Sequence, residues 1–113
     1  MEAATLANNH SQDYGQTGYD DTIAALDAEG VQSFGYDRIA YLDVKGVKVA
    51  LIGSYFPEDS AENTKEMTDN IAAARAEDAQ LVIVYVHWGQ EHEYDITEGQ
   101  QTAGRAAIDA GPI

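Results

Sequence analysis

Two short clusters of polar residues contain all three histidines of this sequence. The first, LANNHSQDYG at residues 6–15, contains two asparagines, a histidine, an aspartate and a turn glycine. The second, VHWGQEHEY at residues 86–94, contains two histidines and two glutamates. Imidazole, carboxylate and amide oxygen all bind divalent metals, and imidazole also exchanges protons near neutral pH. We expect the two clusters to be parts of one catalytic site.

The first cluster places Asn9 beside His10, followed by Asp13 and Gly15. An amide oxygen such as that of Asn9 is a weak metal ligand, useful for ions held mainly by carboxylates and imidazoles. A neighbouring histidine such as His10 can donate a hydrogen bond or a proton to an anionic leaving group. We expect Asp13 to form an Asx turn and Gly15 to take a left-handed conformation before a helix. Because these residue types favour loops on conformational grounds alone, a plain turn is the alternative.

The second cluster begins at His87, near the end of a long apolar run. Active sites of open α/β sheets gather beyond the carboxyl ends of strands, so His87 is a candidate metal ligand. Gly89 leaves room for a close backbone approach. Glu91, His92 and Glu93 are candidates for further ligands or for residues that orient the ligands. The alternative is that His87 merely ends a strand and forms a hydrogen bond to the backbone.

Hydrophobic periodicity predicts an α/β protein with a mixed sheet and flanking helices. The helical patterns cover residues 17–30, 64–79 and 97–111. Extended patterns occur at 31–35, on both sides of the Lys45–Gly46 pair within 38–55, and at 81–88. A glycine between two β-rich runs predicts a tight hairpin, and residues 56–64 are expected to form a polar loop.

The most apolar segment is LVIVYVHW at residues 81–88, which is dense in β-branched residues. Such a run is typical of a central strand that is buried on both faces of a sheet. In the helix expected at 64–79, Met67, Ile71 and Ala74 fall on one face, which is expected to pack against the sheet.

The ends of the predicted elements suggest a partial domain. Thr17 is a candidate N-cap for the first helix, and Gly30 is a natural stop after it. No strand is expected before the first cluster, and the sequence GPI follows the last helix where an α/β unit normally supplies another strand. We therefore expect residues 1–113 to form a single partial domain, the central portion of a larger one truncated at both ends.

Composition excludes several classes of function. The sequence has 6 basic and 20 acidic residues, a net charge of -14, which argues against nucleic acid as a partner because phosphate binding needs clustered Lys and Arg. No cysteine is available for disulfides or thiolate metal sites. No apolar run is long enough to span a bilayer, and MEAAT lacks the features of a signal peptide.

Taken together, the motifs resemble the CapA-type bacterial capsule (poly-γ-glutamate) synthesis proteins, which belong to the calcineurin-like metallophosphoesterase superfamily. The resemblance covers essentially the whole chain. It rests on LANNHSQDYG, on the helix pattern DTIAALDAEGV with Gly35 after it, on GVKVALIGSY, on LVIVYVHWGQE with Gln100 downstream, and on AAIDAG. The combination of NNH…DYG with HWGxE carries most of its specificity.

The resemblance implies part of an α/β/β/α sandwich with a two-metal site for phosphoester hydrolysis. Asn9 matches the metal-bridging asparagine, and His10 the adjacent histidine that steadies or protonates the leaving oxygen. His87 matches a metal-ligand histidine, and Glu91 the acidic residue of HWGxE, with a site-shaping or metal-linked role. The resemblance implies two divalent metal ions (Mn, Fe or Zn) as cofactors and a phosphorylated or anionic polymer as the substrate. It also implies that the protein is located at the bacterial cell envelope.

The sequence also departs from the family pattern. The family usually opens with a strand bearing a Gly-Asp metal motif and continues past DAG into a Gly-x-His-Pro-His segment, and neither is present. His92 and Ile96 stand where relatives commonly have an aromatic residue and a proline. Because Asn9 and His87 alone cannot fix two cations, we expect these 113 residues to bind metal weakly, or not at all, and to lack phosphatase activity.

Two further expectations concern partners. A non-hydrolytic role, as a metal-dependent scaffold or polymer-binding component of cell-envelope polymer assembly, is the alternative to hydrolysis. The apolar strand at 81–88 is also expected to pair with other chains through an exposed sheet edge, giving a dimer.

Overall fold

The computed structural model describes residues 2–57 and 60–111, and it confirms the predicted mixed α/β class with helices flanking a mixed sheet. This arrangement is consistent with an α/β sandwich. The elements follow in the order β1 (Glu2–Thr5), α1 (Gly15–Ala28), β2 (Val31–Phe34), β3 (Ala40–Val44), β4 (Val47–Phe56), α2 (Ala61–Ala76), β5 (Leu81–Trp88) and α3 (Glu98–Asp109).

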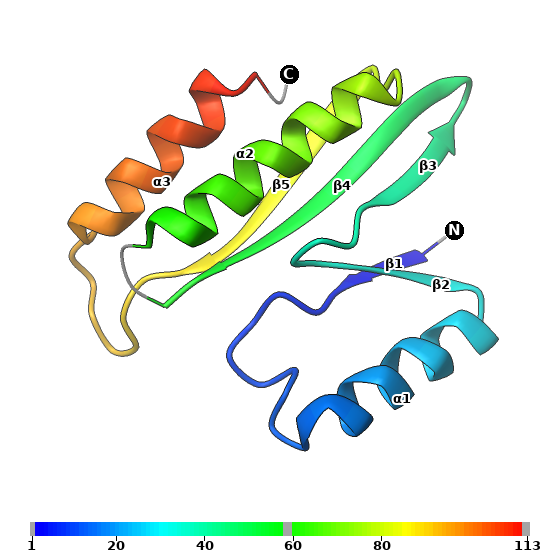
Figure 1. The fold of residues 1–113 in the computed structure, drawn as a ribbon, viewed down its shortest axis with the longest axis horizontal. Helices are drawn as coiled ribbons and strands as arrows, with labels where there is room; N and C mark the ends of the chain where they lie inside the picture. Colours follow the sequence, from blue (N-terminus) through cyan, green and yellow to red (C-terminus); the bar gives the residue numbers. More distant parts are fainter. Residues whose placement is uncertain (1, 58–59, 112–113) are drawn as a thin grey trace.

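The strands form two sheets. β1 and β2 pair in parallel, while the second sheet has the order β3-β4-β5, antiparallel between β3 and β4 and parallel between β4 and β5. The hairpin predicted at Lys45–Gly46 is confirmed, with φ of 53° and 85° at the two turn residues. Two successive positive φ values match the right-handed twist of the strands that they join. Figure 1 shows α1, β1 and β2 at one end of the molecule, with α2 and α3 at the other.

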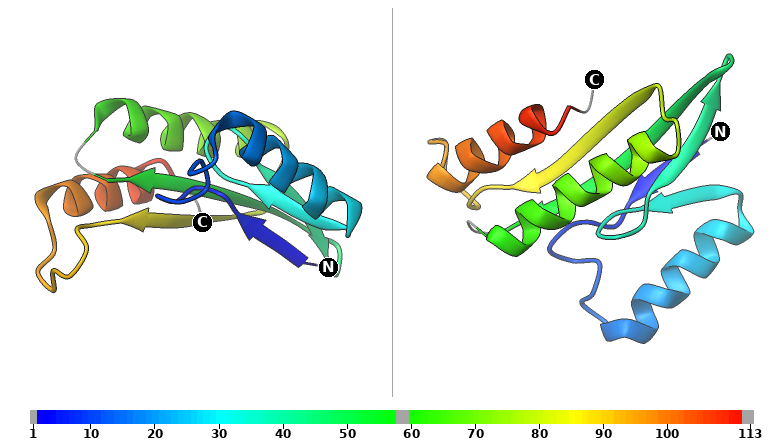
Figure 2. Two further views of the ribbon diagram at one scale, coloured as in Figure 1. Left: turned by 90° about the horizontal axis from the view of Figure 1, so that it is seen from below. Right: turned by 45° about the horizontal axis from the view of Figure 1, so that its top comes forward.

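The main core lies between α2 and one face of the second sheet. The predicted apolar face of α2 is confirmed, because Met67, Ile71 and Ala74 are fully buried, together with Ile52 of β4 and Val82 of β5. α3 contributes alanines to the same core and contacts α2, and the left view of Figure 2 shows both helices on the same side of β5. No helix within the described ranges has the length and apolar character needed to cross a membrane.

The ends of the helices differ from the sequence prediction at two places. α2 begins at Ala61, where the Ser60 side chain accepts a hydrogen bond from the backbone N–H of Asn63, so the polar loop expected at 56–64 is shorter; its residues 58–59 lie outside the described residues. α1 begins at Gly15, so Thr17 lies inside the helix and is not its N-cap. Gly30 ends α1 with a φ of 73°, as expected.

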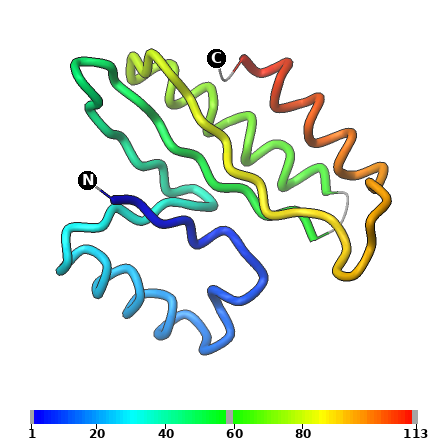
Figure 3. Tube along the Cα trace, turned by 180° about the vertical axis from the view of Figure 1, so that it is seen from behind, coloured from blue at the N-terminus to red at the C-terminus, as the bar shows by residue number. Residues whose placement is uncertain are grey.

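β5 is not the central strand that its composition predicted. β4 is the middle strand, and β5 lies at the edge of the three-stranded sheet. Val82 is 2% exposed, but Ile83 and Tyr85 are 46% and 55% exposed, because α2 and α3 cover only one of the two faces of β5. Seen from behind, β4 and β5 lie in front of the two helices, with no other described element over that part of the sheet (Figure 3).

A strand also precedes the first polar cluster, contrary to expectation. β1 pairs in parallel with β2, placing Ala3 beside Gln32 and Thr5 beside Phe34. Glu and Ala have low strand propensity, so this strand depends on its long-range partner rather than on its own sequence. The pairing fixes the point at which the chain enters the first cluster.

Two glycines bring that cluster close to β4. A Cβ at Gly53 would lie 2.5 Å from Oγ1 of Thr5, and a Cβ at Gly35 would lie 2.7 Å from the backbone nitrogen of Ala7. The backbone N–H of Tyr36 donates to the carbonyl of Gly53 over 3.0 Å. Larger side chains at the two glycines would push the segments apart, so glycine allows the loop after β1 to lie against β4.

Candidate functional site

The loop that follows β1 is anchored at its base. Leu6 donates its backbone N–H to the carbonyl of Phe34 over 2.7 Å, and Ala7 is fully buried. The side-chain oxygen of Asn8 accepts from the backbone N–H of His10 over 2.9 Å, which is the geometry of an Asx turn. The Asx turn expected at Asp13 is therefore formed by Asn8 instead.

Tyr36 connects this loop to the core. Its hydroxyl donates to the backbone carbonyl of Asn8 over 3.2 Å, and its own carbonyl accepts from the side-chain amide of Asn70 over 2.6 Å. Asn70 lies on α2 and is 8% exposed. A continuous series of hydrogen bonds thus runs from the buried side of α2 to the backbone beside Asn9. Sequence reasoning missed this role, because Tyr36 lies 28 residues from Asn8.

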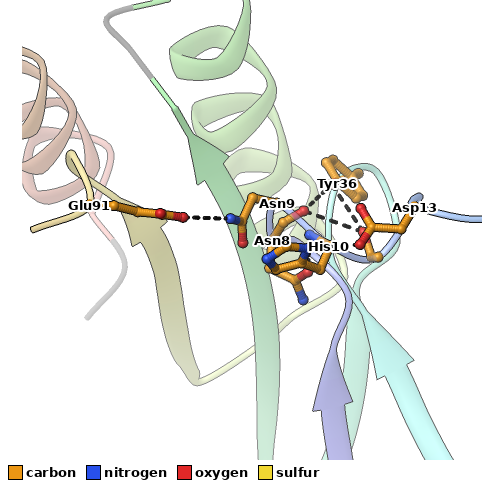
Figure 4. A network of polar contacts seen from close by, with 7 residues as sticks. Asn8, Asn9, His10, Asp13, Tyr36 and Glu91 are labelled. Atoms are coloured by element: carbon orange, nitrogen blue, oxygen red, sulfur yellow. Dashed lines mark hydrogen bonds and ion pairs between the residues drawn. The ribbon is translucent and has the colours of Figure 1, made fainter.

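His10 and Asp13 form a pair within the loop. Nδ1 of His10 lies 2.8 Å from Oδ2 of Asp13, and the side chains are 74% and 51% exposed (Figure 4). A carboxylate only accepts hydrogen bonds, so Nδ1 carries the proton and Nε2 is the nitrogen left for another partner. Gly15, at the start of α1, has a φ of 73°, the left-handed conformation expected from the sequence.

His87 lies near the carboxyl end of β5. It is adjacent to Tyr55 in the parallel register of β4 and β5, and the two rings meet edge to face with centroids 5.7 Å apart. Tyr55 therefore supports one side of the imidazole. The even-numbered Val82, Val84 and Val86 pack into the core, so His87 belongs to the opposite face of the sheet, away from α2.

The turn after β5 depends on Gly89. Its φ is 86°, and a Cβ there would lie 2.7 Å from Nε2 of Gln100. Gln100 is fixed in turn by the capping box of α3, in which its Oε1 accepts from the backbone N–H of Thr97 and its own N–H donates to the Thr97 hydroxyl. The backbone at Gly89 therefore packs closely against the first turn of α3.

The two clusters meet at one open pocket. The pocket has a volume of about 590 Å³, and it is lined by Asn9, His10, Tyr55, Pro57, His87, Trp88, Gly89, Gln90 and Glu91. The side-chain amide of Asn9 donates to Oε1 of Glu91 over 3.1 Å, across 82 positions of sequence. His92 has a φ of 64° and is exposed, and it does not line the pocket.

The residues present do not make a complete metal centre. Within residues 2–57 and 60–111, no three His, Cys, Asp or Glu side chains are grouped closely enough to hold an ion. The pocket combines two imidazoles, one carboxylate and the side-chain amides of Asn9 and Gln90, and the Asp13 carboxylate is directed at His10. This set can orient a ligand and exchange a proton with it.

Comparison with known proteins identifies the family. The family model described as "Bacterial capsule synthesis protein PGA_cap" matches residues 1–113. The chain belongs to this family of bacterial capsule synthesis proteins. The family resemblance found in the sequence motifs is thereby confirmed.

Individual relatives agree with this assignment. The chain is 31% identical over 124 residues to "PGA biosynthesis protein CapA" of Bacillus subtilis, covering 93% of this chain and 33% of the relative. It is 32% identical over 130 residues to "Capsule biosynthesis protein CapA" of Bacillus anthracis, covering 94% of this chain and 31% of the relative. A "Probable polyglutamine synthesis accessory protein" of Mycobacterium tuberculosis is 29% identical over 135 residues, covering 94% of this chain and 36% of the relative. The chain thus spans about a third of the length of these curated relatives.

Proposed function

We propose that the whole capsule synthesis protein acts in the biosynthesis of poly-γ-glutamate at the bacterial cell envelope, and that the pocket at Asn9 and His87 is its site for hydrolysing a phosphoester. The biosynthetic role follows the names of the Bacillus relatives. The observation that carries the chemical proposal is the convergence of both polar clusters on one pocket. A phosphorylated or anionic polymer is the proposed substrate.

In this proposal His10 is the proton donor. Hydrolysis adds water to phosphorus and breaks the bond from phosphorus to the leaving oxygen, which must gain a proton. Asp13 accepts from Nδ1 of His10 over 2.8 Å and so leaves Nε2 as the nitrogen that donates. The carboxylate also stabilises the imidazolium that exists before transfer, as in other His–carboxylate pairs.

The proposed cofactors are divalent cations of Mn, Fe or Zn. Asn9 and His87 are the ligands that this chain would contribute, and they do not complete a site. The remaining ligands would have to come from other residues of the longer protein. These 113 residues alone are therefore expected to bind metal weakly and to lack turnover.

The test is a hydrolysis assay on the longer protein. Purified protein is supplied with Mn²⁺ or Zn²⁺ and offered bis-p-nitrophenyl phosphate and p-nitrophenyl phosphate. We expect turnover that His10→Ala lowers by about a hundredfold or more, the usual scale for losing a general acid. His87→Ala is expected to abolish turnover and weaken metal binding. His92→Ala is the matched control, because His92 lies outside the pocket and its loss should leave the rate unchanged.

A second candidate function is a non-hydrolytic scaffold or polymer-binding component of the assembly machinery. The observation that favours it is the name of the Mycobacterium tuberculosis relative, which is described as a probable synthesis accessory protein. Binding of Mn²⁺ that needs His87, with no turnover on either phosphoester, would favour the scaffold over the enzyme. Turnover that is insensitive to His10→Ala and His87→Ala would show that the pocket is not the reacting site.

A further inference from the structure

The orientation of the Asn9 amide is set by a residue from the other cluster. Nδ2 of Asn9 donates to Oε1 of Glu91 over 3.1 Å, and Figure 4 shows the Glu91 carboxylate facing the nitrogen side of that amide. The two residues come from different ends of the chain. Asn9 belongs to the loop after β1, and Glu91 to the loop after β5.

A carboxylate partner allows only one of the two orientations of the Asn9 amide. An asparagine amide has a donor end and an acceptor end of nearly equal size, and a neutral partner with both functions would accept either orientation. Ionised Glu91 only accepts, so the NH₂ group must face it, and the carbonyl oxygen Oδ1 is turned away. The oxygen of Asn9 is then free for a further partner in the pocket that Asn9 and His87 both line.

Glu91 is itself held in place through its neighbours. Gly89 turns the chain after β5 with a φ of 86° and lies against Gln100. Gln100 is fixed by the capping box at the start of α3. The loop that carries Glu91 is therefore attached both to the end of β5 and to the first turn of α3. The backbone beside Asn9 is held from the other side by the Tyr36 hydroxyl.

We propose that Glu91 is a positioning residue that fixes the Asn9 amide with its oxygen, rather than its nitrogen, available in the pocket. This inference rests on the proposed function for its consequence, because a carbonyl oxygen can accept from a substrate or bind a cation whereas an NH₂ group cannot. The contact itself is independent of that function. Loss of Glu91 should leave the amide free to rotate and the two loops without this connection.

The direct test is the NMR signal of the Asn9 side-chain NH₂ group in the ¹⁵N-labelled 113-residue chain, assigned by its disappearance in Asn9→Ala. Glu91→Ala is expected to move this signal to the position typical of an exposed amide. Glu91→Gln, whose amide can both accept and donate, should move the signal less than Glu91→Ala does but should not leave it unchanged. Glu93→Ala, which removes the same charge two residues away, should not move it. Unchanged backbone signals from β5 and α3 will exclude unfolding.

A signal in Glu91→Ala that matches the one in Glu93→Ala would overturn the proposal. In the longer protein, Glu91→Ala is expected to lower Mn²⁺ affinity or phosphoester turnover by about tenfold, the lower end of the range for residues that orient metal ligands. Glu91→Gln should restore only part of this loss, because glutamine does not force one orientation of the Asn9 amide. If the wild-type protein shows no turnover, the proposed function fails, while the NMR signal still decides whether Glu91 positions Asn9.

Discussion

The two faces of the β3-β4-β5 sheet differ sharply. Between α2 and the sheet, Ile52 of β4 and Met67 and Ile71 of α2 are at most 1% exposed. On the opposite face of β5, Ile83 and Tyr85 are about half exposed. The polar pocket with Asn9 and His87 opens at the carboxyl end of this second face.

This difference separates stability from function within one sheet. The face beneath α2 contains the well-packed apolar side chains, so it supplies most of the hydrophobic stabilisation. The other face contains the pocket, and its apolar residues on β5 are free to contact other molecules. Substitutions on the two faces are therefore expected to have different kinds of effect.

The largest expected effect on stability is at Ile71. Ile71→Ala should lower the free energy of unfolding by about 2–5 kcal/mol, since it leaves a cavity beneath α2. Ile71→Val, expected to cost about 0.5–1.5 kcal/mol, keeps the measurement possible if the alanine variant does not fold. Ile108→Ala is the solvent-exposed control, because Ile108 is 75% exposed on α3 and its loss should cost about 0.5 kcal/mol or less. Urea unfolding of the 113-residue chain measures all three, and equal costs at Ile71 and Ile108 would contradict the comparison.

The next largest expected effect is on the association of two copies of the chain through the unpaired edge of β5. We propose that β5 pairs with β5 of a second copy, since Leu81–Trp88 contains no Asp, Glu, Lys or Arg and no proline or glycine, and its edge has no partner strand in the described part of the chain. Ile83→Lys should weaken the dimer at least about tenfold, equivalent to about 1.4 kcal/mol. Val44→Lys on β3, the opposite edge of the sheet, is the matched control and should have little effect.

Light scattering at increasing concentration measures this association. The net charge of -14 opposes it, so raising the salt concentration should strengthen the dimer. A wild-type chain that remains monomeric at high concentration and high salt would disprove pairing through β5.

Sequence reasoning succeeded where local patterns determine structure. The hairpin at Lys45–Gly46 and the buried face of α2 both follow from neighbouring residues. It failed for β1 and for the position of β5 in the sheet. Which strands pair, and whether helices cover one or both faces of a strand, depends on segments that are distant in the sequence. A continuous apolar run such as Leu81–Trp88 does not report which of its two faces is covered.

The candidate site shows the same division. The sequence identified Asn9, His10, His87 and Glu91 as candidates, and the structure places all four at one pocket, although their chemical roles stay predictions. It could not show that Asp13 pairs with His10, because the choice between an Asx turn and that pair depends on the loop backbone. The contact between Asn9 and Glu91 depends on the whole fold.

The smallest expected effect on stability concerns Glu66, a partly buried carboxylate on α2. Burial, followed by the nearby charge of Asp37, raises the pKa of Glu66 above its ordinary value. Ionised Glu66 is thus less favourable in the folded state than in the unfolded state, and this penalty is relieved as the pH falls through the raised pKa. Glu66→Gln should therefore stabilise the protein at pH 7 and lose this advantage in acid, below the pKa of an unfolded glutamate.

The gain at pH 7 should be about 0.5 kcal/mol or less, because Glu66 is only partly buried and water screens its charge. Thermal unfolding at pH 7 and at acid pH measures it. Glu62→Gln is the comparator on the same helix, because Glu62 lies in the first turn of α2, where a negative charge is favourable, so its loss should lower stability slightly. A gain at pH 7 from Glu62→Gln as large as that from Glu66→Gln would point to the overall negative charge rather than to the burial of Glu66.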